Sequence, residues 1–318
     1  RRRTLNWTRI SLNADILNRP HYFKMAQFNA SLSYDWRANR YTTHSLTPLK
    51  LTYTKLINTT ADFDSIMAAN PAVAQSFESQ FVPQISYTYT YDRKFGRDNT
   101  LNLQLTAQEA GNILWSVWEL TGSKEEKQLF GTPFSQFVKG TAQIVYGHRL
   151  GGTHWLMSRV AVGVAHAYGN SSQVPYSEQF YVGGANSVRA FTVRSVGPGT
   201  YHADDSRYAY MDFRLEGNVE LRARLFGSLH GAVFVDVGNV WLLRDDPARP
   251  GAKLSAENLK NLAVGTGAGL RYDLDFLVLR FDVGIGLHAP YETGKSGWYN
   301  IPRFKDGLGL HFAIGYPF

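Results

Sequence analysis

The chain has 318 residues, no cysteine and a formal net charge of +7, and 14% of its residues are aromatic. The lack of cysteine excludes disulfides and thiolate metal sites. No run of about 18 apolar residues occurs, which excludes a membrane-spanning helix. Spanning strands stay possible, because their alternating residues keep the mean hydropathy low, here -0.27. The positive charge forms no lysine-rich run and therefore favours no particular partner.

The first residues, RRRTLNW, contain neither a Met nor the apolar core of a signal peptide. We therefore interpret the sequence as a mature or truncated chain.

Apolar and polar residues alternate in segments along the whole chain, which is the pattern of β-strands. In the first third, Phe81, Ile85, Tyr87, Tyr89 and Tyr91 alternate with polar residues, and Leu101, Leu103 and Leu105 do the same. Near the end, alternation runs through residues 262 to 272, 277 to 287 and 308 to 318. The last of these segments predicts that the sequence ends on a strand.

The most informative strand is predicted over residues 208 to 225. One side of it is apolar and the other side is charged or polar. The apolar side consists of Met211, Phe213, Leu215, Val219, Leu221, Ala223 and Leu225, and the polar side of Asp212, Arg214, Glu216, Asn218, Glu220, Arg222 and Arg224.

Strand number and strand length distinguish a transmembrane β-barrel from a large soluble β-protein. The pattern contains about twelve strands, many of about ten residues or more, against the usual five or six residues in globular proteins. Trp115, Trp118, Trp155, Trp241 and Trp298 lie near predicted strand ends, where interfacial aromatic residues belong. We therefore predict an all-β fold, a transmembrane antiparallel β-barrel, in preference to a large soluble β-protein.

The connections alternate between short and long, as in outer-membrane barrels. Short ones cover residues 93 to 99, 149 to 154 and 272 to 276, and long ones cover 58 to 79, 117 to 135, 168 to 206, 243 to 261 and 288 to 306. The segment ADFDSIMAANPAVAQSF in the first long connection predicts a short helix. No linker divides residues 1 to 318, so we expect one domain.

A motif in the longest connection carries a family resemblance. The stretch YVGGANSVRAF resembles the loop motif of the BamA/TamA superfamily of outer-membrane assembly factors, usually VRGF or IRGF after a glycine pair. GNVELR (217 to 222), FVDVGNVW (234 to 241) and GLGLHFAIGYPF (307 to 318) follow in the family's order. The resemblance covers about residues 137 to 318, and the first third resembles more loosely the members from Bacteroidota.

The resemblance implies a sixteen-strand barrel, of which about twelve C-terminal strands lie in this sequence. Up to four N-terminal strands and the periplasmic POTRA repeats would be absent from this chain. It also implies that the loop of about residues 168 to 206 folds inward into the lumen, with Val188, Arg189, Ala190 and Phe191 as its motif.

In that family the loop arginine bonds carboxylates on the next two strands, which by position are Glu220 and Asp236. Strand alternation independently puts both carboxylates on the face away from lipid. Four loop glycines, Gly183, Gly184, Gly197 and Gly199, would let the backbone return. Ala190 stands where the family usually has Gly.

The function implied by the resemblance is an insertase or translocase that folds barrel proteins through a lateral seam between its first and last strands. Residues of the last strand suggest a weak seam, because glycine lacks a packing side chain and proline lacks an N–H. They are Gly307, Gly309, Gly315, Pro317 and Phe318.

The implied location is the outer membrane of a Gram-negative bacterium. The implied partners are unfolded outer-membrane proteins, outer-membrane lipids, lipopolysaccharide and accessory lipoproteins or periplasmic subunits. No nucleic acid, cofactor or metal is expected.

Other functions stay open at this point. A two-partner-secretion transporter shares the barrel and a similar motif. In a passive channel, Arg189 would be an ordinary loop residue, and Glu220 and Asp236 would be lumen-lining charges. Alternatively, the salt bridge of Arg189 braces the barrel and has no part in transport. A phospholipase would need a serine partner for His166, which the sequence does not supply. No G-x-S-x-G elbow occurs, and ETGKSG (292 to 297) follows Ala289 where a P-loop needs Gly, so we expect no enzyme.

Overall fold

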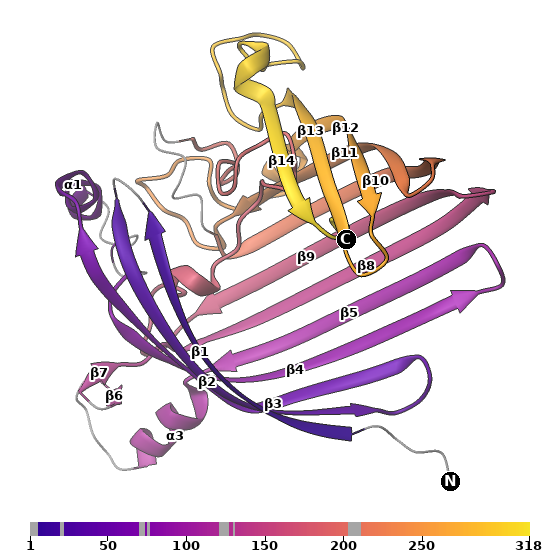
Figure 1. The fold of residues 1–318 in the computed structure, drawn as a ribbon. Helices are drawn as coiled ribbons and strands as arrows, with labels where there is room; N and C mark the ends of the chain where they lie inside the picture. Colours follow the sequence, from indigo (N-terminus) through magenta and orange to yellow (C-terminus); the bar gives the residue numbers. More distant parts are fainter. Residues whose placement is uncertain are drawn as a thin grey trace. The chain divides into compact units, whose positions relative to one another are not determined.

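The computed structural model describes residues 6–19, 22–69, 74, 77–120, 127–129, 131–202 and 211–318. Within these residues, twelve strands form one sheet in the order β1-β2-β3-β4-β5-β8-β9-β10-β11-β12-β13-β14, and β6 and β7 form a separate small hairpin (Figure 1). Neighbours in the sheet follow one another in sequence, except that β6 and β7 lie between β5 and β8 in the chain. They pair antiparallel wherever their register is defined. The predicted antiparallel all-β fold of about twelve strands is confirmed.

The chain divides into two compact units. The first comprises Arg1–Tyr91, Gln104–Thr141 and Ala165–Gln179. It contains β1 (Asn6–Arg19), β2 (Phe23–Arg37), β3 (Thr42–Thr59), α1 (Ala61–Ala69), most of β4 (Gln80–Phe95), part of β5 (Asn99–Ala110), α3 (Asn112–Leu120), β6 (Gln128–Leu129), β7 (Thr132–Pro133), the start of β8 (Phe137–Gly151) and the 3-10 helix η1 (Tyr176–Glu178).

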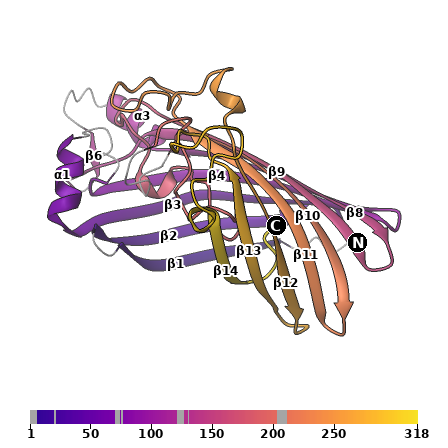
Figure 2. The same ribbon diagram turned by 90° about the horizontal axis from the view of Figure 1, so that it is seen from above.

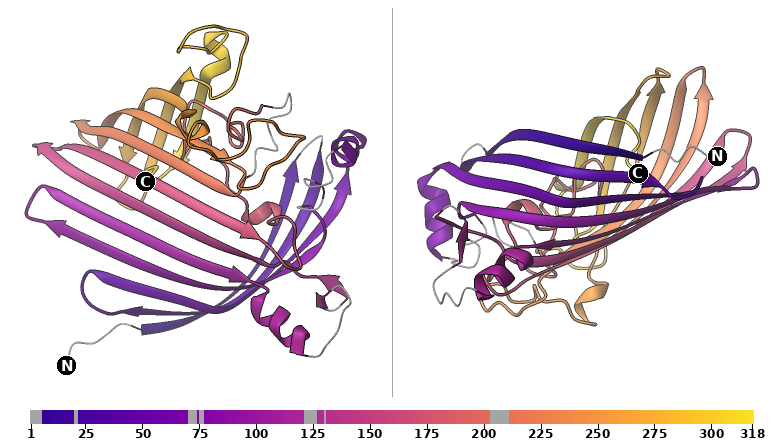
Figure 3. Two further views of the ribbon diagram at one scale, coloured as in Figure 1. Left: turned by 180° about the vertical axis from the view of Figure 1, so that it is seen from behind. Right: turned by 90° about the horizontal axis from the view of Figure 1, so that it is seen from below.

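The second unit comprises Asp92–Leu103, Ala142–Val164 and Phe180–Phe318. Its elements are most of β8 and β9 (His154–Ala167), then β10 (Phe213–Phe226), β11 (Leu229–Trp241), η3 (Asn258–Lys260), β12 (Ala263–Asp273), β13 (Val278–His288), η4 (Phe304–Gly307) and β14 (Leu308–Ile314). The strands β10 to β13 run side by side (Figures 2 and 3).

The strand β10 has one apolar and one polar face, but their burial is reversed relative to a soluble protein. On β10, Val219 and Leu225 are 45% and 53% exposed, whereas Glu216 and Glu220 are 2% and 0% exposed. Hydrocarbon on the exposed side and charge on the buried side is the arrangement of a strand between lipid and a polar interior. No helix in the described ranges is both long enough and apolar enough to cross a membrane.

Two connections contain helices. The predicted helix in the first long connection is confirmed as α1. The helix α3 was not predicted, and it holds Trp115 and Trp118, which we had expected at strand ends. Gly111, with φ +75°, follows β5, and the Glu109 carboxylate accepts a hydrogen bond from the N–H of Asn112, where α3 begins.

Two strands differ from their predicted bounds. β10 begins at Phe213 rather than at residue 208, and residues 208 to 210 lie outside the described ranges. β14 ends at Ile314, so the prediction that the sequence ends on a strand is wrong. Gly315, with φ +83°, turns the backbone out of the ladder, and a left-handed conformation of this kind favours glycine.

In the first unit, the segment before the loop motif is held by aromatic packing and by the ion pairs of Glu178. The ring of Tyr176 lies 5.5 Å from that of Phe23 and 4.4 Å from that of Phe77, and all three side chains are buried. The Glu178 carboxylate accepts a hydrogen bond of 3.0 Å from Lys139 Nζ, and Lys50 Nζ lies 3.9 Å away. These contacts fix η1 against β2, β3 and β8.

The ion pairs of Glu178 predict that the stability of the fold around η1 depends on pH. Burial by itself raises the pKa of Glu178, but the charges of Lys139 and Lys50 outweigh it and hold the pKa below its ordinary value. The carboxylate therefore stabilises the fold above its unfolded pKa of about 4.3, and this stabilisation is lost as pH falls through the lower folded value.

We expect Glu178→Gln to lower the stability of η1 near neutral pH and to reduce its loss on acidification. Protease sensitivity of residues 168 to 180 between about pH 3 and pH 7 measures this. Glu257→Gln, at an exposed carboxylate, is the control. Identical pH profiles for Glu178→Gln and the unmodified chain would contradict the assignment.

Candidate functional site

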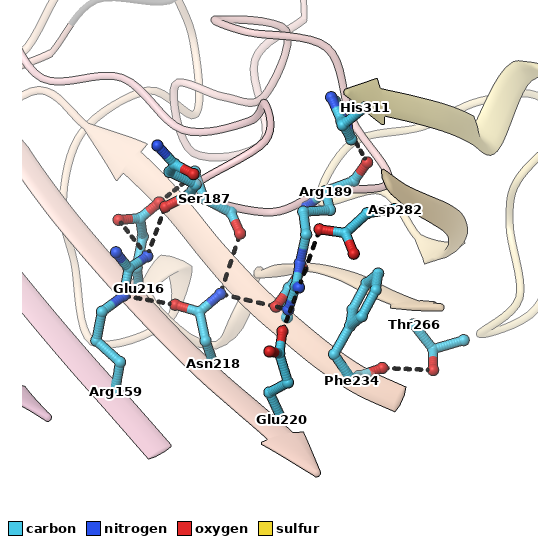
Figure 4. Close-up of polar contacts among 12 residues, drawn as sticks. Arg159, Ser187, Arg189, Glu216, Asn218, Glu220, Phe234, Thr266, Asp282 and His311 are labelled. Carbon is cyan, nitrogen blue, oxygen red and sulfur yellow. Dashed lines mark hydrogen bonds and ion pairs between the residues drawn. The ribbon is translucent and has the colours of Figure 1, made fainter. Parts of the chain in front are cut away.

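The predicted loop motif lies buried against the polar face of the second unit (Figure 4). Val188 and Arg189 are fully buried, and Ala190 and Phe191 nearly so. The Gly184 N–H donates a hydrogen bond of 2.8 Å to the Phe191 carbonyl, which closes the motif into a compact loop.

The loop glycines lie where the backbone needs them. Gly183 and Gly184 have φ of +104° and +94°, and Gly197 and Gly199 have φ of +82° and +56°. These are left-handed conformations that favour glycine. The Gly199 N–H donates to the Val240 carbonyl at 2.7 Å, so the returning arm of the loop is tied to β11.

The Arg189 guanidinium contacts both carboxylates named from the sequence. Its Nε and Nη2 donate to Asp236 Oδ2 and Oδ1 at 2.8 and 2.9 Å, a bidentate pair. Its Nη1 donates to Glu220 Oε2 at 2.5 Å. The Arg189 backbone N–H also donates to Asp236 at 3.1 Å. The ring of Phe234 lies under the guanidinium, 3.3 Å from its central carbon.

The charge of Arg189 is held by these partners. Burial by itself lowers the pKa of Arg189, but hydrogen bonds and charge from Asp236, together with Glu220, raise the pKa above its ordinary value. The geometry needs the planar fork of an arginine, which a lysine cannot reproduce.

Three further charged residues, which were not predicted for the site, complete the cluster. Arg271 on β12 donates to Glu220 at 3.1 Å and to Asp282 at 2.5 Å. Arg280 Nη1 lies 3.6 Å from Asp282 on the same strand, β13. Arg189, Arg271 and Arg280 therefore face three carboxylates, Glu220, Asp236 and Asp282, and each carboxylate has an arginine within 4 Å. Arg271, Arg280 and Asp282 lie in the alternating segments 262 to 272 and 277 to 287, on the side opposite the apolar residues, but alternation does not say which residues across strands meet.

A second polar group orients the carboxylate of Asp236. Asn218 Nδ2 donates to Asp236 Oδ1 at 2.8 Å and to the Ser187 carbonyl at 3.0 Å. Arg159 on β9 donates to Asn218 Oδ1 at 2.9 Å. The Ser187 hydroxyl donates to Glu216. These bonds tie the residues just before Arg189 to β9 and β10.

The loop backbone also contacts the last strands of the sheet. His311 on β14 donates from Nε2 to the Arg189 carbonyl oxygen at 2.7 Å. A Cβ at Gly284 or Gly309 would overlap the Arg189 backbone, so these two glycines allow the loop to approach β13 and β14 closely. Gly265 on β12 likewise leaves room for the methyl group of Ala190.

The five residues predicted for the last strand do not share one strand. Gly307 lies in η4 and Gly309 in β14, whereas Gly315, Pro317 and Phe318 follow the end of β14. After Ile314 the backbone leaves the ladder at Gly315, so Pro317 occupies no ladder position.

Phe318 instead lies against the polar face. Its ring is 5.3 Å from the guanidinium carbons of both Arg159 and Arg222. Arg222 donates to the Phe318 carbonyl at 3.3 Å and to Glu220 at 2.7 Å. The end of the described chain is thus connected to the ion cluster.

A hydrocarbon face on one side of antiparallel strands and a buried polar face on the other define a membrane protein built of strands. The model of the Omp85 superfamily domain matches residues 3–318, and the chain belongs to this superfamily. The outer membrane protein assembly factor BamA of Neisseria meningitidis serogroup B is 31% identical over 131 residues, 38% of this chain and 16% of that protein. The chloroplastic outer envelope protein 80 of Oryza sativa subsp. japonica is 34% identical over 180 residues, 57% of this chain and 22% of that protein.

Solved structures show the same fold. The crystal structure of BamA from Haemophilus ducreyi lacking POTRA domains 1-3 matches with a TM-score of 0.63 at 15% identity, covering 98% of this chain and 62% of that chain. CdiB from Escherichia coli matches with a TM-score of 0.54 at 15% identity, covering 98% of this chain and 50% of that chain. The chain spans less than two thirds of each relative. The predicted barrel fold and outer-membrane localisation are confirmed.

A charge swap tests the ion cluster. Arg189→Glu adds a carboxylate beside Glu220 and Asp236, and we expect it to destabilise the docked loop by about 3–5 kcal/mol. Adding Asp236→Arg should restore part of this loss. Heat-modifiable gel mobility measures it. An unchanged mobility of Arg189→Glu would show that the cluster does not stabilise the fold.

A glycine substitution tests the close approach of the loop. We expect Gly284→Ala to displace the Arg189 backbone and to speed trypsin cleavage within residues 187 to 199 several-fold. In the control Gly231→Ala, the atoms nearest to the new methyl group belong to the flexible Leu225 side chain, the first at 3.3 Å. Equal cleavage of both variants would contradict the role of Gly284.

Proposed function

We propose that this chain is the barrel part of an insertase that folds outer-membrane proteins in the outer membrane of a Gram-negative bacterium. The observation that carries the proposal is the position of Arg189 between two groups of strands. Its guanidinium is fixed by carboxylates of β10 and β11, while its carbonyl accepts a hydrogen bond from β14. The loop therefore connects the wall of the second unit to the last strand in the sheet order.

The last strand supports a seam that opens. β14 has 7 residues, against 11 in its neighbour β13, and so forms fewer ladder bonds. A strand with few bonds separates at the least cost in free energy. A substrate strand then adds to the exposed edge by β-augmentation, with main-chain hydrogen bonds supplying the affinity.

The relatives support the same function. The Neisseria protein is an outer membrane protein assembly factor, and it is 31% identical to this chain over 131 residues. The substrates are accordingly unfolded outer-membrane proteins, and the partners are accessory lipoproteins or periplasmic subunits that deliver them. The proposed activity is strand exchange and uses no cofactor and no catalytic residue.

A second candidate is a two-partner-secretion transporter or a channel. The likeness in fold to CdiB favours it. The two candidates differ in the fate of the substrate, because an insertase leaves a folded barrel in the bilayer and a transporter releases its substrate across it.

His311→Ala tests the proposal in proteoliposomes that hold the full-length protein. It removes the hydrogen bond between the loop and β14 and leaves the ion cluster intact. We expect the rate at which a urea-denatured barrel substrate becomes protease-resistant and heat-modifiable to change several-fold. His230→Ala is the control, because the His230 ring bonds the nearby Ser228 carbonyl and makes no hydrogen bond to the loop among the described residues. Passage of the substrate across the bilayer without its insertion would favour the transporter.

A further inference from the structure

The lipid-facing side of the first unit contains a hollow across β1 to β4. It has a volume of about 420 Å³, and its lining includes Ala14, Phe28, Ala30, Leu51, Tyr53 and Phe81. These residues lie on the exposed apolar side of their strands, where Phe28 is 54% exposed. The hollow therefore opens toward the hydrocarbon of the membrane and not toward the polar face.

The register explains the hollow. Ala14 pairs with Phe28, and Ala30 pairs with Leu51, so a small side chain stands beside a large one on neighbouring strands. Phe28 pairs with Tyr53, which in turn pairs with Phe81, and the last two rings are 4.8 Å apart. The two alanines form the floor of the hollow and the aromatic residues form its wall.

A hollow of this chemistry has one suitable occupant. An empty gap would lose the dispersion contacts of its lining atoms. Water is stable in such a space only with several polar partners, and the lining is predominantly apolar. A hydrocarbon chain of the surrounding lipid meets neither obstacle.

Two lysines stand on the same face, beyond one end of the hollow. Lys55 lies two residues after Tyr53, about 7 Å along β3, and Lys24 lies four residues before Phe28, about 13 Å along β2. Lys55 pairs with Ala26, so the two lysines are diagonal neighbours on adjacent strands. In the part of the chain that the structure describes, no carboxylate lies within ion-pair distance of Lys24 or Lys55.

The position of the lysines selects the leaflet. They lie near the start of β2 and the end of β3, where the chain enters the long connection that contains α1. At the opposite end of these strands, a short turn joins β2 to β3. Long connections are extracellular in this class of barrel. Cations on the lipid face cost least near the interface, where a phosphate group can pair with them. The outer leaflet carries its phosphates on the lipid A part of lipopolysaccharide.

We propose that this face binds one lipid A molecule, with an acyl chain in the hollow and a phosphate on Lys24 and Lys55. The site goes beyond the proposed function and does not depend on it, since a channel with the same strands would bind the same lipid. It differs from general lipid contact because it requires a shaped apolar hollow and a pair of cations together.

Native mass spectrometry of the full-length protein, incubated with lipid A in detergent, tests the site. We expect the unmodified protein to retain one lipid A. The variant Ala30→Phe fills the hollow, and the double variant Lys24→Gln, Lys55→Gln removes the cations. Each of the two should lower the retention of lipid A at least about ten-fold, equivalent to 1.4 kcal/mol. The controls are Leu32→Phe, outside the hollow on the same strand, and Lys94→Gln, at the other end of β4 and on the face opposite Phe81; both should retain the lipid.

The outcomes separate the possibilities. Heat-modifiable gel mobility first shows that each variant is folded, and either of the two site variants suffices if the other does not fold. Retention that is equal in site variants and controls, or absent from the unmodified protein, would overturn the proposal. Equal retention of phosphatidylglycerol would overturn the assignment to lipid A.

Discussion

The second unit depends on one constraint, which is that a fully buried guanidinium must be neutralised where it lies. Arg189 comes from a loop, whereas Glu220, Asp236 and Asp282 come from β10, β11 and β13. Removing charges from water costs several kcal/mol for each ion, and only close, well-oriented partners recover it. The loop and these strands are therefore stable in their present arrangement only together. If Arg189 were absent, Glu220 and Asp282 would keep Arg271, but Asp236 would lose its bidentate partner and be a buried carboxylate.

The same constraint explains the small residues around the motif. Because the guanidinium reaches the carboxylates only when the backbone lies against the strands, the facing positions carry glycine, as at Gly284 and Gly309. The departure from the family motif at Ala190 follows this rule, since Gly265 supplies the space that its methyl group takes up. Close approach also brings the Arg189 carbonyl to His311, and so links the cluster to β14. The buried ion cluster, the Arg189 backbone and β14 are therefore joined by one continuous set of contacts.

The sequence led to part of this site. Alternation put Glu220 and Asp236 on the polar face, and the family resemblance pointed to them as partners of Arg189. The sequence did not reveal that Arg271 and Asp282 belong to the ion cluster. Both alternate onto the polar faces of their strands, but alternation assigns a residue to a face and does not identify its cross-strand neighbour. Their meeting depends on the register of β10 to β13 and on where the loop crosses it. The contact of Phe318 with Arg222 was hidden for a related reason, since the alternation of residues 308 to 318 continues past the turn at Gly315.

The sequence by itself determined the strands, their two faces and the class of membrane protein. Successive side chains of a strand point to opposite sides, so the local alternation of residue types shows which side faces lipid and which side faces the polar interior. Only the tertiary structure decided which charges pair, where α3 replaces a strand end, and how the alanines of β1 and β2 open a hollow beside Tyr53. These features depend on strand register and on the paths of loops, which bring together residues far apart in the chain and which no local pattern encodes.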